Sequence, residues 1–325
     1  MRLIIPAIIV VLLAVVGQAT AQQKVEFNIS PVGGMHFGDT RFNLEFIYQR
    51  ADSSLGLGGS ELVFPLDVTE AGAEIGFRSL KADHQVWSGN LRVLFTVNNP
   101  GNKMTDRDWI TNNNATMDWS STESTVDGSL TELEFQSTRL LVSGRTVELA
   151  ALLGAGYQKI KQKMIDLSGW QFGYDVNDSL VVYVIDERLL AGTYEIQYIR
   201  PEVGLEFRLL TGSFSFDLRP VVSPLLHVKD LDDHVLRYFT IKTDGRGVGY
   251  GGSVNLTFEP KSSKRILPRV QLGGDFFGAQ VDVSGYREYY RDNPDENAVK
   301  GDRFAEEHTV KTRQYGVHLA VGVWF

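Results

Sequence analysis

An alternation of apolar and polar residues with a period of two runs through most of this chain, and it constrains the fold more than any other feature. The clearest run, between positions 214 and 228, has apolar side chains at Phe214, Phe216, Leu218, Val222, Leu226 and Val228. The end of the chain repeats the pattern at Tyr315, Val317, Leu319, Val321, Val323 and Phe325. Such alternation places one class of side chain on each face of a β-strand. Convincing helical periodicity is missing, so the sequence predicts an all-β fold.

The first residues have the pattern of a secretory signal. An apolar run from Leu3 to about Val16 is followed by Ala19-Thr20-Ala21, a small-residue cleavage site. We therefore expect a signal peptide at residues 1–21 and a single exported domain at residues 22–325. The 325-residue chain contains no cysteine and has a formal net charge of -8. Disulfides therefore cannot stabilise the exported domain, and the acidic balance argues against a nucleic-acid partner.

The connectors between the alternating segments are short and long in turn. The short ones fall near 81–86, 143–145, 211–213 and 260–265, and the long polar ones near 49–58, 104–128, 164–192, 230–245 and 286–310. Even strand numbers, short periplasmic turns and long outer loops are typical of outer-membrane barrels, and closure leaves no unpaired edge in the bilayer. We predict a closed antiparallel transmembrane β-barrel of about ten strands.

Two acidic clusters fall in the second and fourth long connectors, which leave such a barrel on the same side. Asp106 and Asp108 are two residues apart in an extended segment, so they point the same way and raise each other's pKa. Asp232 and His234 have the same spacing, which lets a carboxylate orient an imidazole that takes a proton from water. These residues predict a hydrolytic site without a metal. The alternatives are solvated loops or a Ca²⁺ site.

Other motifs accompany the two clusters along the chain. They are Ser60-Glu61-Leu62, Gly156-Tyr157-Gln158 and Pro201-Glu202-Val203-Gly204-Leu205. Together with the clusters, and in the same order, they resemble the omptin family of outer-membrane proteases. The resemblance implies an endopeptidase of the bacterial outer membrane, with its active site facing the cell exterior, a peptide or protein substrate and no cofactor. It also implies that Asp232 and His234 activate the attacking water, opposite a carboxylate pair formed by Asp106 and Asp108.

The resemblance further implies where substrate and lipid bind. Omptins favour cleavage near basic residues, and Asp230 matches one acidic residue at the base of their pocket. The second acidic position falls at Phe42, with Glu45 as the nearest carboxylate. Omptins also bind lipopolysaccharide as an activating lipid on the outer barrel wall. The candidates here, in contact with outer-membrane lipid, are Tyr157, Lys161 and Arg246.

The parity of the run 214–228 conflicts with this assignment. Its apolar, lipid-facing positions are even, so the same parity places Asp232 and His234 on the outer face unless a β-bulge re-aims them. The predicted function is an aspartic-type outer-membrane endopeptidase. One alternative is a catalytically inactive barrel that acts as an adhesin or ligand-binding protein. Another is a passive porin, against which a lumen filled by pairs such as Arg219 and Asp217 would argue.

Overall fold

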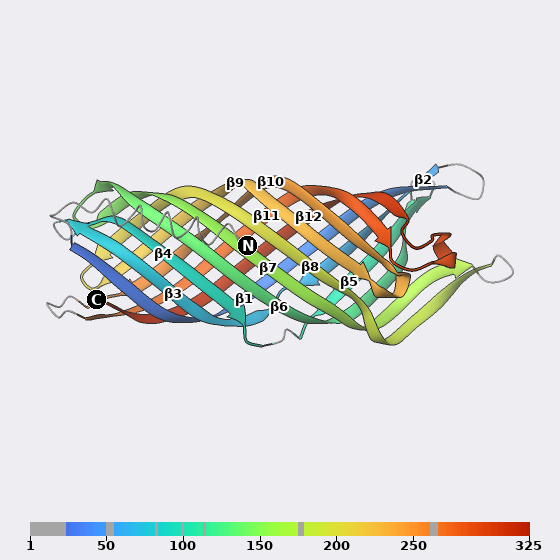
Figure 1. The fold of residues 1–325 in the computed structure, drawn as a ribbon, viewed down its shortest axis with the longest axis horizontal. Helices are drawn as coiled ribbons and strands as arrows, with labels where there is room; N and C mark the ends of the chain where they lie inside the picture. Colours follow the sequence, from blue (N-terminus) through green and yellow to red (C-terminus); the bar gives the residue numbers. More distant parts are fainter. Residues whose placement is uncertain are drawn as a thin grey trace.

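The chain folds into a closed antiparallel barrel. A computed structural model describes residues 24–49, 55–81, 84–98, 101–112, 115–174, 179–260 and 266–325, so the expected signal peptide lies outside the described residues. The last strand, β12 (Arg303–Trp324), pairs with the first, β1 (Lys24–Gln49), which closes the sheet (Figure 1). Backbone hydrogen bonds join Phe27 to Phe325 in both directions. Within the described ranges, no helix is long and apolar enough to cross a membrane.

The twelve labelled strands form a ring of ten because two positions in the ring are each shared by two strands. Both β2 (Leu55–Pro65) and β3 (Val68–Lys81) pair with β1, while both β4 (His84–Thr96) and β5 (Lys103–Asn112) pair with β6 (Ala115–Ser143). The ring continues through β7 (Val147–Tyr174), β8 (Leu180–Thr211), β9 (Phe214–His234), β10 (Phe239–Phe258) and β11 (Leu267–Tyr289). The predicted ten-stranded barrel is confirmed.

The expected long polar loops are largely strand. The described parts of 104–128, 164–192 and 230–245 lie mostly in the ends of paired strands, and the 3₁₀ turn Val235–Arg237 lies within the third of these segments. Irregular backbone is retained mainly at 290–302, which includes the 3₁₀ turn Pro294–Glu296. The loop expectation was therefore wrong for these segments: the hairpins extend the barrel at the end opposite Phe325, which we call the distal end (Figure 1).

The barrel wall has two zones with opposite polarity. Near the chain termini, large apolar side chains point outwards and form an apolar belt that includes Phe27, Ile29, Ile75, Phe95, Leu153, Val203, Phe207, Phe216, Leu218, Leu256, Leu272 and Leu319. Nearer the distal end the apolar side chains point inwards, and Tyr194, Ile196 and Tyr198 of β8 are fully buried. The belt is suited to lipid, whereas the distal zone is built around a core as in a water-soluble protein.

A β-bulge in β9 reverses which face its side chains occupy. Ser223 pairs with Gly249 of β10 whereas Leu226 pairs with Gly247, so β9 has one extra residue at Pro224–Leu225. Odd positions such as Asp217 are buried before the bulge, and even positions such as Leu226 are buried after it. Leu226 and Val228 were predicted to face lipid and instead lie in the core. The same reversal turns Asp232 inwards.

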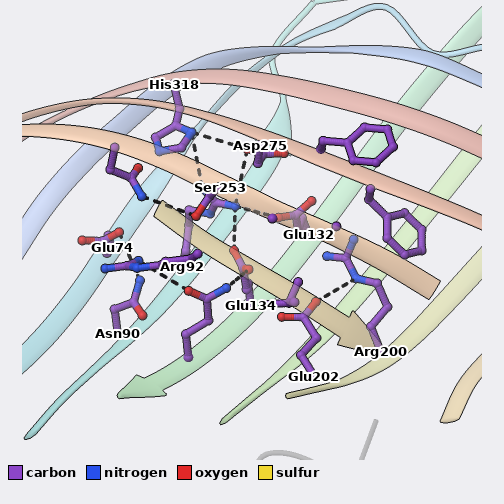
Figure 2. Close-up of a pocket in the computed structure, with 18 of the residues that line it drawn as sticks. Glu74, Asn90, Arg92, Glu132, Glu134, Arg200, Glu202, Ser253, Asp275 and His318 are labelled. Atoms are coloured by element: carbon purple, nitrogen blue, oxygen red, sulfur yellow. Dashed lines mark hydrogen bonds and ion pairs between the residues drawn. The ribbon is translucent and has the colours of Figure 1, made fainter. Parts of the chain in front are cut away.

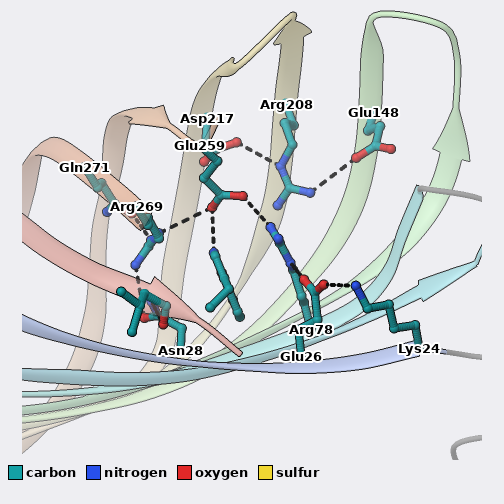
Figure 3. A network of polar contacts seen from close by, with 12 residues as sticks. Lys24, Glu26, Asn28, Arg78, Glu148, Arg208, Asp217, Glu259, Arg269 and Gln271 are labelled. Carbon is teal, nitrogen blue, oxygen red and sulfur yellow. Dashed lines mark hydrogen bonds and ion pairs between the residues drawn. The ribbon is translucent and has the colours of Figure 1, made fainter. Parts of the chain in front are cut away.

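The lumen at the level of the apolar belt is closed by ion pairs. The Nη2 atom of Arg92 lies 2.6 Å from Glu134 and 3.2 Å from Glu132, beside a cavity of only about 50 Å³. Figure 2 shows these residues in the lumen. Further towards the termini, Arg208 contacts Glu148 and Asp217, at 3.2 and 2.9 Å (Figure 3). The expected partner of Arg219 was Asp217, but its Nε atom lies 2.6 Å from Glu206. These charges compensate each other inside the barrel.

Candidate active site

A groove of about 1400 Å³ opens at the distal end of the barrel. Its walls come from β1, β2 and β5 to β12, so the groove is formed by the rim of the whole ring. Asp106, Asp108, Asp232 and His234 all line it. The structure thus brings the two predicted pairs into one cavity, although more than 120 residues separate them in the sequence.

Asp106 and Asp108 point into the groove from β5. They follow Met104, a buried core residue on the same face of the strand, so the alternation of β5 directs all three inwards. Asp106 accepts a hydrogen bond from Ser60 at 3.3 Å, and Asp108 accepts one from Ser120 at 2.7 Å. Each carboxylate is therefore held by a hydroxyl of a neighbouring strand.

Asp232 and His234 form the second pair at the end of β9. The Nε2 atom of His234 lies 2.9 Å from Oδ2 of Asp232, and the imidazole packs against Phe239 with ring centroids 4.5 Å apart. The His234 side chain is 25% exposed, whereas that of Asp232 is 5% exposed. The second oxygen of Asp232, Oδ1, is buried and has no hydrogen-bond partner among the described residues. A buried carboxylate oxygen without a partner can accept a hydrogen bond from a water molecule or from a substrate N–H.

The two pairs influence each other electrostatically across the groove. Burial, reinforced by the negative charge of Asp108, raises the pKa of Asp106 to about 7, and the His234 imidazole opposes this rise. Asp232 contributes a smaller upward effect on the same pKa. At neutral pH the Asp106 carboxyl is therefore about half protonated.

The raised pKa of Asp106 predicts that Asp106→Asn stabilises the barrel at high pH. Because the pKa is about 7 in the folded protein against a model value of 3.8, the wild type loses stability as the pH rises between these values. The amide avoids this loss. The gain, on the order of 1–2 kcal/mol, should appear at pH 8 and be smaller at pH 5. It is measured as the temperature at which the folded, heat-modifiable gel band disappears.

The matched control is Asp127→Asn, which changes an exposed carboxylate on the neighbouring strand β6. An equal gain for Asp106→Asn at both pH values would contradict the assignment.

Asp230 lies beneath the groove and not in its lining. Its side chain is 0% exposed, its Oδ1 atom accepts a hydrogen bond from Thr243, and its Oδ2 atom lies 3.2 Å from Nε2 of His308. His308 is itself covered by Phe42, with ring centroids 4.5 Å apart. Phe42 and His308 line the groove, whereas Asp230 does not. The acidic residue that the resemblance places at the base of the pocket is thus buried, and both of its carboxylate oxygens have a partner.

Comparison with known proteins places this architecture in a family. The model of the Omptin family matches residues 69–271, which is more than half of the chain. The chain belongs to the omptin family. Among solved structures, the outer membrane protease OmpT from Escherichia coli is similar in fold, with a TM-score of 0.67 and 13% sequence identity over 92% of this chain and 97% of that one.

Two other solved structures align with this omptin too poorly to carry an argument. A FadL homologue of Pseudomonas aeruginosa has a TM-score of 0.23 and 9% identity, over 93% of this chain and 90% of that one. The TodX monoaromatic hydrocarbon channel has a TM-score of 0.19 and 6% identity, over 94% and 90%. No curated protein sequence matches the chain significantly.

The remaining predicted residues of this omptin lie outside the groove lining. Glu45 occupies an exposed position on β1 between Leu44 and Phe46, which line the groove, so its side chain points away from it. Tyr157 and Lys161 lie on the outward face of β7, and Arg246 is exposed on β10. Lys161 is 3.4 Å from Glu195, an acid that also pairs with Lys159.

Three residues at or beside the groove have contacts that the sequence did not predict. Ser60 and Ser120 donate hydrogen bonds to Asp106 and Asp108, and the His308 imidazole forms a hydrogen bond with Asp230. His308 shares the inward, even parity of β12, which could have marked it as an interior residue. Among the residues that the structure describes, no group of three or more histidines and acids is arranged to hold a metal ion.

Proposed function

We propose that this omptin is an endopeptidase of the bacterial outer membrane whose groove faces the cell exterior. The observation that carries the proposal is the pairing of Asp232 with His234 on one wall of a groove and Asp106 with Asp108 on another. The apolar belt supports contact with outer-membrane lipid, and it leaves the distal end outside the bilayer. The fold of the OmpT protease supports the same reaction class.

In the proposed mechanism, His234 acts as general base towards water. If Asp232 accepts the Nε2–H of the imidazole, Nδ1 is the nitrogen that takes a proton from the attacking water. The water oxygen forms a bond to the scissile carbonyl carbon. The protonated carboxyl of Asp106 then donates a hydrogen bond to the developing oxyanion. When the C–N bond breaks, the His234 imidazolium returns its proton to the leaving amine.

The charge of the groove supports substrates with basic residues near the cleaved bond. Among the described residues that line the groove, eight are acidic and three are arginines. The arginines are Arg237, Arg287 and Arg291, and two of them are paired with Glu296 or Glu306. A cleft with this excess of negative charge attracts positively charged peptides from solution.

We further propose that lipopolysaccharide contacts Tyr157, Lys161 and Arg246 on the outer wall. All three side chains are outward, and phosphate groups favour such cationic and phenolic partners. The Lys161→Ala/Arg246→Ala variant should need about tenfold more added lipopolysaccharide for half-maximal activity, since about 1.4 kcal/mol of binding corresponds to that change. The control is Lys103→Ala, which removes an exposed lysine of β5. An unchanged lipopolysaccharide dependence would contradict the site.

The closed lumen and the exposed active groove argue against the two alternative functions. A passive porin needs a continuous water-filled passage, but the ion pairs around Arg92 and the distal core interrupt the lumen of the described barrel. An inactive adhesin has no need of the buried, unpartnered Asp232 oxygen, which costs stability. Incubation of the purified protein with lipopolysaccharide and a peptide library tests the proposal. Internal cleavage is expected, and an uncleaved library would contradict it.

A further inference from the structure

The groove has a floor directly beneath the two catalytic pairs. We call it the floor recess and define it by Phe42, Met104, Ile241 and His308, which all line the groove. Met104 lies two residues before Asp106 on the same face of β5, and Ile241 is the cross-strand partner of Asp232. The recess therefore adjoins the space between the two pairs.

We propose that the floor recess binds an uncharged, apolar side chain next to the scissile bond and excludes arginine and lysine from that position. The inference rests on the proposed function, and it specifies which class of substrate side chain the groove accepts next to the scissile bond. Basic residues of the substrate then lie further along the peptide, where the acidic walls of the groove are accessible.

The first support is the charge balance beneath the recess. Both oxygens of Asp230 are engaged, one by Thr243 and one by His308, and its side chain has no exposed surface. A substrate cation entering the recess would meet the His308 imidazole and not the carboxylate. Desolvating a cation without an accessible anion is costly, because its lost hydration is not replaced.

The second support is the apolar character of the recess. Phe42 packs edge-on against Phe64 and Tyr194, with ring centroids 5.5 and 5.0 Å apart, so it is fixed in place by the distal core. Met104 belongs to the same core and is flexible enough to adapt to different side chains. An apolar side chain gains roughly 25 cal/mol for each Å² that it buries here.

The acidic residue one step above His308 on the inward face of β12 is also compensated. The carboxylate of Glu306 lies 3.2 Å from Nη2 of Arg287 and is buried. A cationic side chain would have to displace Arg287 in order to use it. The carboxylates of the catalytic pairs also line the groove, but they must stay free for the reaction.

The test uses three peptides that differ only at the residue before the cleaved bond, with norleucine, arginine or glutamate there and basic residues further away. We expect kcat/KM for norleucine to exceed that for arginine at least tenfold. His308→Ala should shift this ratio towards arginine at least tenfold, because it uncovers the Asp230 carboxylate. The double variant His308→Ala/Asp230→Asn should lose the shift. His84→Ala, which breaks a histidine–glutamate pair at the opposite end, is the control.

A wild-type preference for arginine would overturn the inference, whether or not the variants fold. So would a folded His308→Ala protein with the wild-type ratio. If no peptide is cleaved, the relative affinities of the same peptides for the purified protein are measured by competition binding, and they test the recess separately. Tighter binding of norleucine supports the recess while the proposed function fails, and equal or tighter binding of arginine overturns the recess itself.

Discussion

His234→Ala should lower kcat/KM for peptide cleavage by about 10²–10⁴-fold, the contribution typical of a positioned general base. The imidazole is the group that Asp232 orients into the groove, at 2.9 Å. The barrel should keep its heat resistance, because its stability comes from the closed sheet and the distal core. Asp232→Asn should also lose activity, since an amide does not stabilise the imidazolium that forms during the reaction.

The control for His234→Ala is again His84→Ala, which removes an imidazole paired with Glu148 at 3.0 Å near the chain termini. Activity should be unchanged in that variant. Wild-type rates in a folded His234→Ala protein would show that His234 is not the base.

Replacing both facing carboxylates, Asp106→Asn with Asp108→Asn, should reduce kcat/KM by about 10²–10³-fold, as does loss of a preorganised group that stabilises an oxyanion. The two amides fill the same space and can still accept the hydrogen bonds of Ser60 and Ser120. The fold should therefore survive. Full activity of this folded variant would remove the pair from the mechanism.

The same pair predicts the shape of the pH profile. Above a pH of about 7, Asp106 loses the proton that the oxyanion needs, so kcat/KM should fall as the pH rises. The single variant Asp106→Asn has no carboxyl proton to lose, so the alkaline decline should be absent from the activity that it retains. A decline that persists unchanged would assign it to another group.

The sequence predicted the ring of ten strands because alternation and turn spacing are local properties. It could not predict the face of Asp232, since the parity of β9 depends on one extra residue at Pro224–Leu225 that is visible only in its pairing with β10. The sequence does not mark the distal hairpins as strands, because their inward side chains belong to a core that is shared by distant strands.

Part of the chemistry of the groove was predictable, because residue spacing within a strand is a local property. The Asp-x-Asp and Asp-x-His spacings fix which side chains share a face, and the structure brings both pairs to one cavity. The state of Asp230 was not predictable, because its partner His308 lies 78 residues further along the chain and reaches it across the lumen. Contacts of this kind depend on the closure of the barrel and leave no local pattern.

The central claim is tested most directly by intact bacteria that carry the protein and are given a peptide attached to beads too large to enter the cell. Wild-type cells should release the peptide fragment, and cells with equal amounts of the His234→Ala protein should not. Equal release by both would contradict the catalytic site. Release by the wild type only after the cells are broken would contradict a groove that faces the exterior.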